Sequence, residues 1–200
     1  MSKVFIHDSA EVNDNAVLED NVKIWNLAQV REGARIGSNT ILSKNVYVDF
    51  DVVIGRDVKI QNNVSVYHGV TIEDEVFVGP SAIFTNDVRP RATNVGWKIT
   101  KTLVRKGASI GAGATIVCGI EIGEHAMIGS GSVINKDVPP HALMVGNPAR
   151  CVGFVYKNGN KVETRHMHSV NEINATVQFI EPNSQEILEI PFERIKIVSA

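Results

Sequence analysis

His68 and Asn86 are the residues of this 200-residue chain whose types and spacing best suit chemistry, because they lie 18 residues apart beside an irregular stretch. An imidazole exchanges protons near neutral pH, and a primary amide both donates and accepts hydrogen bonds. Irregular segments carry a large share of binding and catalytic residues. The pair is therefore a candidate polar site with one titratable group, and a solvated histidine at a turn of the chain is the alternative interpretation of His68.

The elements that would position this pair are marked by a large apolar residue at every sixth position, from Ile6 to Phe84 and from Val104 to Ile134. A small or β-branched residue follows each of these after four positions, as Ala10 follows Ile6. A period of six fits neither a helix nor the alternation of a simple strand, so the repeating unit is a short strand and a corner. The sequence therefore predicts an all-β solenoid with one continuous core.

Glycine, asparagine and aspartate recur at the expected corners. Glycine often follows the large apolar residue directly, and Asn or Asp often stands three positions after it. These residue types tolerate the backbone angles that a corner demands. The corner residues are Gly37, Gly55, Gly111, Gly123, Gly129, Asn21, Asn39, Asn45, Asp57, Asn63 and Asp137.

The repeat is interrupted between Phe84 and Val104, whose spacing of 20 is not a multiple of six. Residues 85–103 are therefore predicted to leave the solenoid as a loop, and a loop of this length is often functional. Basic residues gather in and beside it, and they fit either a solvated loop or an anion site. These residues are Arg89, Arg91, Lys98, Lys101, Arg105 and Lys106.

The hexads end at Pro139 and Pro140, because proline cannot continue a hydrogen-bonded coil. The predicted domains are a β-helix, residues 1–150, and a C-terminal extension of β-hairpin and strands, residues 151–200, that covers the last coil. In the extension we expect a strand at 152–156, a hairpin turn at 157–160, strands at 175–180, 187–190 and 194–198, and a turn at 182–184.

The composition fits one ordinary domain with an appendage, with 44% hydrophobic residues and a formal charge of −2. No basic patch points to nucleic acid, no apolar run is long enough for a membrane span, and no signal sequence opens the chain, so we expect a cytoplasmic protein. The two cysteines, Cys118 and Cys151, are too few for a disulfide framework and lack metal-ligand spacing.

The repeat resembles that of left-handed parallel β-helix proteins, in which three hexads make one triangular coil of 18 residues. With coils of this size the repeat makes six or seven coils, which are interrupted by the inserted loop and followed by the C-terminal β appendage. Because residues 18 apart then occupy the same wall of adjacent coils, His68 and Asn86 are expected to stack on each other.

A narrower resemblance rests on three segments, residues 59–67, 77–86 and 145–150. Together they look like the bacterial N-acetyltransferases that acetylate the 3-amino group of a UDP- or dTDP-linked amino sugar with acetyl-CoA, in surface polysaccharide (O-antigen) biosynthesis. The likeness covers residues 1 to about 155. It implies a homotrimer with each active site between two prisms, acetyl-CoA as cosubstrate and no metal.

The resemblance also implies roles for individual residues. Asn86 matches the asparagine that holds the acceptor amine, and His68 is then a base or a contact to the sugar. The backbone around Gly111, Ala112, Gly129 and Ser130 matches the ledge for the pantetheine arm, and Lys136 and Arg150 match residues that meet the CoA phosphates. The nucleotide-sugar pocket is expected near Asn63, Tyr67, Phe84, Arg89 and Arg91.

Several alternatives stay open at this point. The acceptor of a hexapeptide acyltransferase could be another small molecule, and the chain could be a non-catalytic trimeric scaffold. A zinc-dependent carbonic anhydrase would need three well-placed histidines, and the four in the predicted prism show no close spacing: His7, His68, His125 and His141. The sequence does not separate UDP from dTDP, or acetylation at C3 from acetylation at C4.

Overall fold

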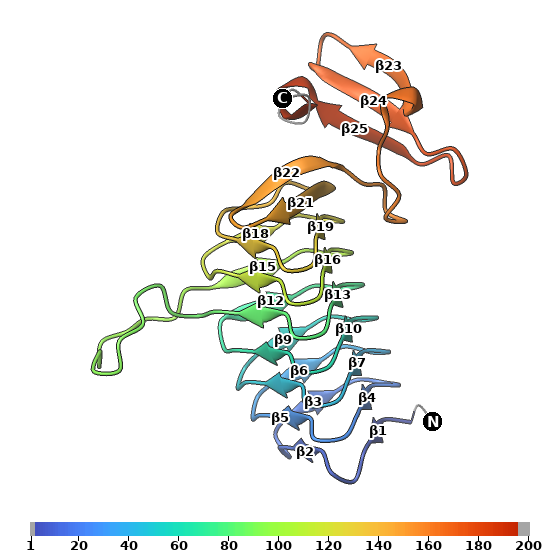
Figure 1. Ribbon diagram of the computed structural model, residues 1–200. Helices are drawn as coiled ribbons and strands as arrows, with labels where there is room; N and C mark the ends of the chain where they lie inside the picture. Colours follow the sequence, from blue (N-terminus) through green and yellow to red (C-terminus); the bar gives the residue numbers. More distant parts are fainter. Residues whose placement is uncertain (1–2, 196–200) are drawn as a thin grey trace.

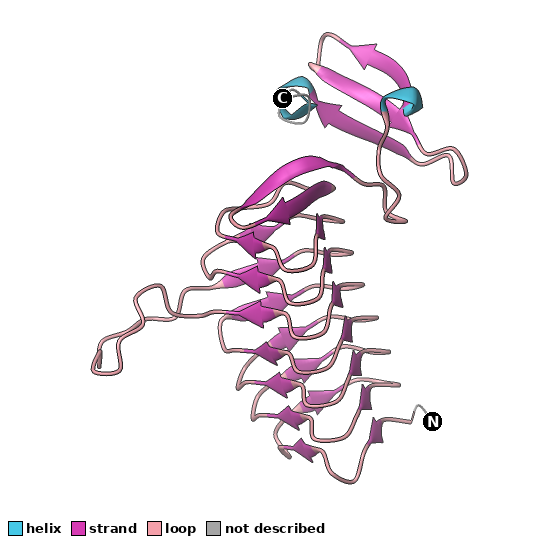
Figure 2. Cartoon of the chain, in the orientation of Figure 1, coloured by secondary structure: helices cyan, strands magenta, loops and turns pink. Residues whose placement is uncertain are grey.

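The computed structural model describes residues 3–195, which form a parallel β-helix of about eight turns that carries a protruding loop and a small C-terminal sheet (Figure 1). Figure 2 shows that nearly all of the regular structure is strand; the helical segments are a 3-10 turn, η1 (Thr164–His166), and a short α-helix, α1 (Phe192–Ile195). The predicted fold, an all-β parallel β-helix of hexapeptide repeats with an inserted loop and a β appendage, is confirmed.

Three parallel sheets form the faces of the prism, and we name them A, B and C in the order in which the chain visits them. Face A contains β1 (Phe5–Ile6), β4 (Lys23–Ile24), β7 (Ile41–Leu42), β10 (Lys59–Ile60), β13 (Phe77–Val78), β16 (Ser109–Ile110), β19 (Met127–Ile128) and β21 (Ala142–Gly146). Face B contains β2 (Glu11–Val12), β5 (Gln29–Val30), β8 (Tyr47–Val48), β11 (Ser65–Val66), β14 (Ile83–Phe84), β17 (Thr115–Ile116) and β20 (Val133–Ile134). Face C contains β3 (Val17–Leu18), β6 (Arg35–Ile36), β9 (Val53–Ile54), β12 (Val70–Ile72), β15 (Thr102–Val104) and β18 (Glu121–Ile122).

The strand register turns the sixfold repeat into columns of stacked side chains. Residues 18 apart pair along each face, as Lys23 pairs with Ile41. Across the inserted loop the partners are 32 apart, as in Phe77 and Ser109, so the loop adds 14 residues to one coil without changing the register (32 minus 18). The loop itself spans residues 85–101, because β15 begins at Thr102, two residues before the predicted end.

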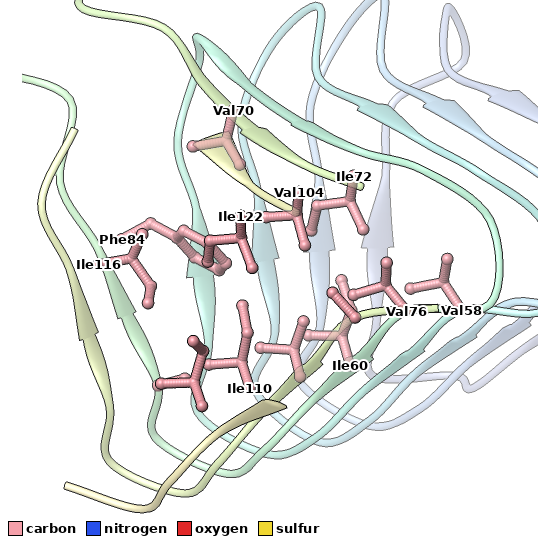
Figure 3. Close-up of a cluster of buried hydrophobic side chains, with 14 of the residues drawn as sticks. Val58, Ile60, Val70, Ile72, Val76, Phe84, Val104, Ile110, Ile116 and Ile122 are labelled. Atoms are coloured by element: carbon pink, nitrogen blue, oxygen red, sulfur yellow. The ribbon is translucent and has the colours of Figure 1, made fainter. Parts of the chain in front are cut away.

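The second residue of each two-residue strand points into the prism, as do the first and third residues of β12 and β15, and these side chains build one core (Figure 3). Ile60 and Ile110 are fully buried, whereas Ile6 in the first coil is 43% exposed, because within the described residues that coil has a neighbour on one side only. Burial of each such side chain contributes roughly 1.5–3 kcal/mol. The stacked hydrophobic residues therefore hold the corners between the faces in place.

The corners use asparagine and glycine for two different reasons. Asn21, Asn39 and Asn45 adopt left-handed backbone angles, with φ between 59° and 61°, as predicted. The predicted reason is wrong for Gly37 and Gly111, which have ordinary angles: a Cβ at Gly37 would lie 2.5 Å from the backbone of Gly55. These glycines are needed because adjacent coils approach too closely for a side chain.

The prolines that were predicted to end the hexads are followed by one more strand of the prism. β21 pairs in parallel with β19 on face A, which brings the count to about eight turns in place of the expected six or seven. Pro139 occupies the corner position that Gly123 occupies one coil earlier. At that position Gly123 donates its backbone N–H to the next coil, at Val138 O. No further coil is stacked on Pro139 in the described part of the chain, so its missing N–H loses no bond.

The chain then reverses into the antiparallel strand β22 (Ala149–Phe154), which pairs with β21. The domain boundary expected at residue 150 falls inside this strand, and we propose that the appendage starts after Phe154. A tight turn at residues 157–159 follows, closed by a hydrogen bond from Gly159 N to Tyr156 O of 2.9 Å, in agreement with the predicted hairpin.

A three-stranded antiparallel sheet completes the appendage: β23 (Met167–Asn171), β24 (Thr176–Ile180) and β25 (Ile187–Pro191). The strands expected at 175–180 and 187–190 and the turn at 182–184 are confirmed. The strand expected at 194–198 is wrong for Arg194 and Ile195, which belong to α1, and its remaining residues lie outside the described part. No helix between residues 3 and 195 is long and apolar enough to cross a membrane.

Candidate active site

The edge between faces B and C, which we call the B–C edge, carries the predicted pair. His68 follows β11 and Asn86 follows β14, so the register places them in adjacent coils. Asn86 Nδ2 donates to the carbonyl oxygen of His68 over 3.5 Å, a long hydrogen bond. The predicted stacking of the two residues is therefore confirmed, and Cys118 and Lys136 continue the column because β14, β17 and β20 pair in register.

His68 is held from the coil below. Its Nδ1 lies 2.9 Å from the carbonyl oxygen of Phe50, and its ring stacks on the Phe50 ring at a centroid distance of 4.1 Å and an interplanar angle of 14°. A carbonyl oxygen only accepts hydrogen bonds, so Nδ1 must carry the proton. In the neutral imidazole, Nε2 is then the nitrogen with the free lone pair.

Asn86 stands where the inserted loop leaves and rejoins the prism. Its carbonyl oxygen accepts a hydrogen bond from Thr100 N at 3.1 Å, which closes the base of the loop. Beside it, the hydroxyl oxygen of Thr85 accepts a bond from Cys118 N at 2.9 Å. The amide side chain of Asn86 therefore projects from a part of the loop that is tied to the solenoid on both sides.

The rest of the loop extends away from the prism (Figure 1). Val95 at its tip is fully exposed, Trp97 is 46% exposed, and the side chains of Arg89 and Arg91 lie in solvent. Within the described chain, the two arginines are therefore free to meet an anion from outside.

The predicted pantetheine ledge lies on another edge, between faces A and B, which we call the A–B edge. Gly111 stacks on Gly129, and a Cβ at Gly111 would lie 2.5 Å from the backbone nitrogen of Ser130. Asn63 lies on the same edge, where it accepts a hydrogen bond from Asn45. Face B separates this edge from His68 and Asn86, so one chain does not bring the two sets together.

Two residues expected at the nucleotide-sugar pocket have different surroundings. Tyr67 is 38% exposed on the B–C edge, directly before His68. Phe84 is 1% exposed, and its ring lies among core residues such as Ile116 (Figure 3). As the second residue of β14 it points inward, so its side chain cannot touch a substrate, and we correct its assignment from substrate contact to core residue.

Lys136 and Arg150 meet at one pocket of about 340 Å³ near the C-terminal end of the prism. Lys136 comes from the end of the B–C column and Arg150 from β22, and Met144 adds an apolar wall. Two cations beside an apolar wall suit a ligand that carries both phosphate and hydrocarbon groups.

Sequence reasoning missed the residues that hold His68 from below. Asp49 accepts hydrogen bonds from the backbone nitrogens of Phe50 at 2.9 Å and of His68 at 3.2 Å, and from the Tyr47 hydroxyl at 2.9 Å. Burial, and then the Asp49 carboxylate, raise the pKa of Tyr47. The hydrogen bonds that Arg31 donates to Glu32, and then to the Tyr47 hydroxyl oxygen, raise the pKa of its guanidinium, whose Nη1 lies 4.0 Å from Asp49.

The sequence did contain a signal for these residues. Phe50 precedes His68 by 18 positions, the same spacing that pointed to Asn86. Among residues 3–195, no group of three or more His, Cys, Asp or Glu side chains is placed to hold a metal ion.

Family models match the repeated part of the chain. The model of the bacterial transferase hexapeptide (six repeats) matches residues 51–86 and 101–136, and the model of the hexapeptide repeat of succinyl-transferase matches residues 33–68. The gap between the two matched spans coincides with the inserted loop.

A probable serine acetyltransferase 2 from Oryza sativa subsp. japonica is 54% identical over 63 residues, which are 32% of this chain and 18% of that protein. The chain therefore matches less than a fifth of the length of this curated relative.

Solved structures share the fold. A hexapeptide-repeat-containing acetyltransferase from Vibrio cholerae O1 biovar eltor, complexed with acetyl coenzyme A, has a TM-score of 0.56 and 27% identity over 61% of this chain and 70% of that chain. Galactoside acetyltransferase in complex with coenzyme A has a TM-score of 0.56 and 23% identity over 66% of this chain and 73% of that chain, a likeness of fold. Over residues 33–86 and 101–136 the chain is therefore similar to hexapeptide-repeat transferases, and the parallel β-helix is the fold that it shares with the solved acetyltransferases.

Proposed function

We propose that the chain is an acetyl-CoA-dependent N-acetyltransferase that acetylates the amino group, at C3, of a UDP- or dTDP-linked amino sugar for surface polysaccharide synthesis. The observation that carries the proposal is the pair of adjacent side chains on the B–C edge. There Asn86 projects from the base of the loop, and the Nε2 lone pair of His68 is left available by the bond at Nδ1. The acetyl-CoA complex of the Vibrio cholerae protein and the three segments that resemble sugar N-acetyltransferases support the choice of substrates.

The chemistry needs few groups. The amine nitrogen of the sugar attacks the thioester carbonyl carbon, a C–N bond forms, and the C–S bond breaks with its electron pair on sulfur. The nitrogen loses one proton, and the products are the amide and the free thiol of CoA. Because a thiol has a pKa near about 8.5, sulfur leaves readily and can collect the proton itself.

In this reaction Asn86 orients the amine, and His68 accepts the proton at Nε2. Alignment of the two substrates supplies a large share of the rate, backbone N–H groups aimed at the developing oxyanion add to it, and a positioned base adds roughly 10²- to 10⁴-fold. Lys136 and Arg150 bind the phosphates of CoA in the pocket that they line. Asn63, Tyr67, Arg89 and Arg91 bind the nucleotide sugar.

The assembly that this requires is a homotrimer. The ledge on the A–B edge and the pair on the B–C edge flank the same face of one prism, so one chain alone does not unite them. A neighbouring copy can place its A–B edge against the B–C edge of the first. With three copies, face B of each one lies toward the common axis and three equivalent sites form.

The experiment is a thiol-release assay with acetyl-CoA and a panel of UDP- and dTDP-linked 3-amino and 4-amino sugars. We expect turnover with at least one 3-amino sugar, and loss of most of that turnover in Asn86→Ala without a change in trimer stability. His68→Asn should lose roughly 10²-fold or more, while His7→Asn, the same change at a distant corner, should not. Full activity in Asn86→Ala would refute the assignment.

The two remaining candidates predict different results. An acyltransferase for another small acceptor would bind acetyl-CoA in isothermal titration and release thiol only with acceptors outside the panel. A non-catalytic scaffold would not bind acetyl-CoA.

A further inference from the structure

His68 makes a specific set of contacts to the coil below that the proposed function does not explain. The side chain contacts a carbonyl oxygen and a phenyl ring, and the backbone nitrogen donates to a carboxylate, all from the dipeptide Asp49–Phe50. A solvated corner histidine needs none of them.

The carbonyl oxygen of Phe50 decides which nitrogen of His68 carries the proton. The bond from Nδ1 is 2.9 Å long and has an acceptor that cannot donate. His7, at another corner, is bonded in the opposite way: its Nδ1 accepts from the backbone nitrogen of Ser9 at 3.1 Å and lies 3.0 Å from the hydroxyl of Ser9. The surroundings therefore select a protonated Nδ1 at His68 and an unprotonated Nδ1 at His7.

The ring of Phe50 fixes the plane of the imidazole. The two rings are nearly parallel, at 14°, with centroids 4.1 Å apart. A stacked pair in this range contributes beyond its buried area. The imidazole is thus held on its Phe50 side, and the bond from Nδ1 to the Phe50 carbonyl turns Nε2 away from that carbonyl. Asn86, in the coil above, bonds the backbone carbonyl of the same residue.

Asp49 holds the backbone that carries these two groups. One oxygen of its carboxylate accepts the bond from Phe50 N, and the other accepts the bond from His68 N in the next coil. The carboxylate is only 13% exposed and is oriented further by the Tyr47 hydroxyl. It thereby ties Phe50 and His68 together across the coil boundary.

We propose that Phe50, locked in place by Asp49, is a positioning residue for His68: it imposes the Nδ1–H tautomer and the ring orientation that direct the basic Nε2 at the acceptor amine. This inference rests on the role proposed for His68 as the proton acceptor. It places a further determinant of the reaction one coil below the residues that touch the substrates.

The test combines a spectrum with kinetics. The ¹⁵N NMR spectrum of protein labelled at histidine is recorded at pH 8, where ordinary imidazoles are neutral. His68 should show a protonated Nδ1 and an unprotonated Nε2, and its signals are assigned by their loss in His68→Asn. His7 serves as an internal reference. A protonated Nε2 at His68 in the wild type would overturn the proposal whether or not the protein acetylates amino sugars.

The kinetic part uses Phe50→Leu, which keeps the backbone carbonyl and removes the ring. We expect kcat to fall about three- to tenfold, the range that one lost stacking contact allows, with an unchanged KM for acetyl-CoA and recovery in Phe50→Tyr. Phe5→Leu is the matched control, because Phe5 is 40% exposed against 37% for Phe50 and packs on Trp25 far from the site. An unchanged kcat in Phe50→Leu, or an equal loss in Phe5→Leu, would overturn the positioning role.

Discussion

Replacement of Gly37 by alanine tests the packing of the coils most directly. Gly37 has an ordinary backbone angle, so a local argument predicts that alanine stabilises the protein by roughly 0.4–1 kcal/mol through the unfolded state. The structure predicts the opposite sign. A Cβ at this position would lie 2.5 Å from the carbonyl carbon and oxygen of Gly55 and 2.7 Å from Arg56 N.

The magnitude follows from the atoms that the methyl group meets. Ordinary contacts between such atoms are about 3.5–4.0 Å, so the overlap is roughly 1 Å, and all three neighbours are backbone atoms that cannot rotate away. Overpacking costs roughly 1–3 kcal/mol. Separation of the coils also weakens the hydrogen bond from Gly37 N to Ile54 O, which is 2.8 Å long, at about 1 kcal/mol.

We therefore expect a loss of about 3 kcal/mol, or roughly 6–12 °C in Tm for a chain of this length. Thermal unfolding followed by circular dichroism measures it. Gly131→Ala is the control, because Gly131 has a φ of +69° but open space where the Cβ would be. Alanine at this left-handed backbone angle costs about 1–2 kcal/mol, which the lower conformational entropy of the unfolded chain partly offsets. If Gly37→Ala is as stable as the wild type, the coils are not packed as the structure has them.

Three other predictions concern the appendage, the C-terminal pocket and the core. Hydrogen bonds from the Ser184 backbone and the Asn160 side chain lower the pKa of Glu181 to about 2. Because this pKa is below the value in the unfolded chain, the carboxylate stabilises the fold above about pH 4.5, and this stabilisation is lost as the pH falls toward 2. The Tm difference between the wild type and Glu181→Gln should therefore narrow between these pH values, and a constant difference would contradict the prediction. Arg150→Ala should raise the KM for acetyl-CoA at least several-fold with little change in kcat, and the rise in KM should be larger at low than at high salt. A change in kcat alone would exclude the phosphate contact. Ile110→Ala, at a position with no exposed surface, should cost about 2–5 kcal/mol in denaturant unfolding, and a loss below about 1 kcal/mol would mean that Ile110 is not in a close-packed core.

From the sequence, only those site residues could be predicted that lie 18 positions apart. The stacking of Asn86 on His68 followed from that spacing together with the coil of 18 residues that the resemblance implied, and Phe50 carries the same signal one coil earlier. Phe84 shows the limit of a carried-over motif: it lies two residues before Asn86, yet the alternation of the strand turns its ring into the core.

The sequence by itself determined the solenoid and the place of the inserted loop, because an apolar residue at every sixth position is buried when the hexads stack in register. The resemblance to left-handed β-helix proteins supplied the three faces. Only the tertiary structure decided which backbone atoms would lie within 2.5 Å of a Cβ at Gly37, and which tautomer His68 adopts. It also decided that the Gly111 ledge and the His68–Asn86 pair occupy different edges. These features depend on contacts between coils, and such contacts are set by the exact approach of two backbones that a pattern of residue types does not specify.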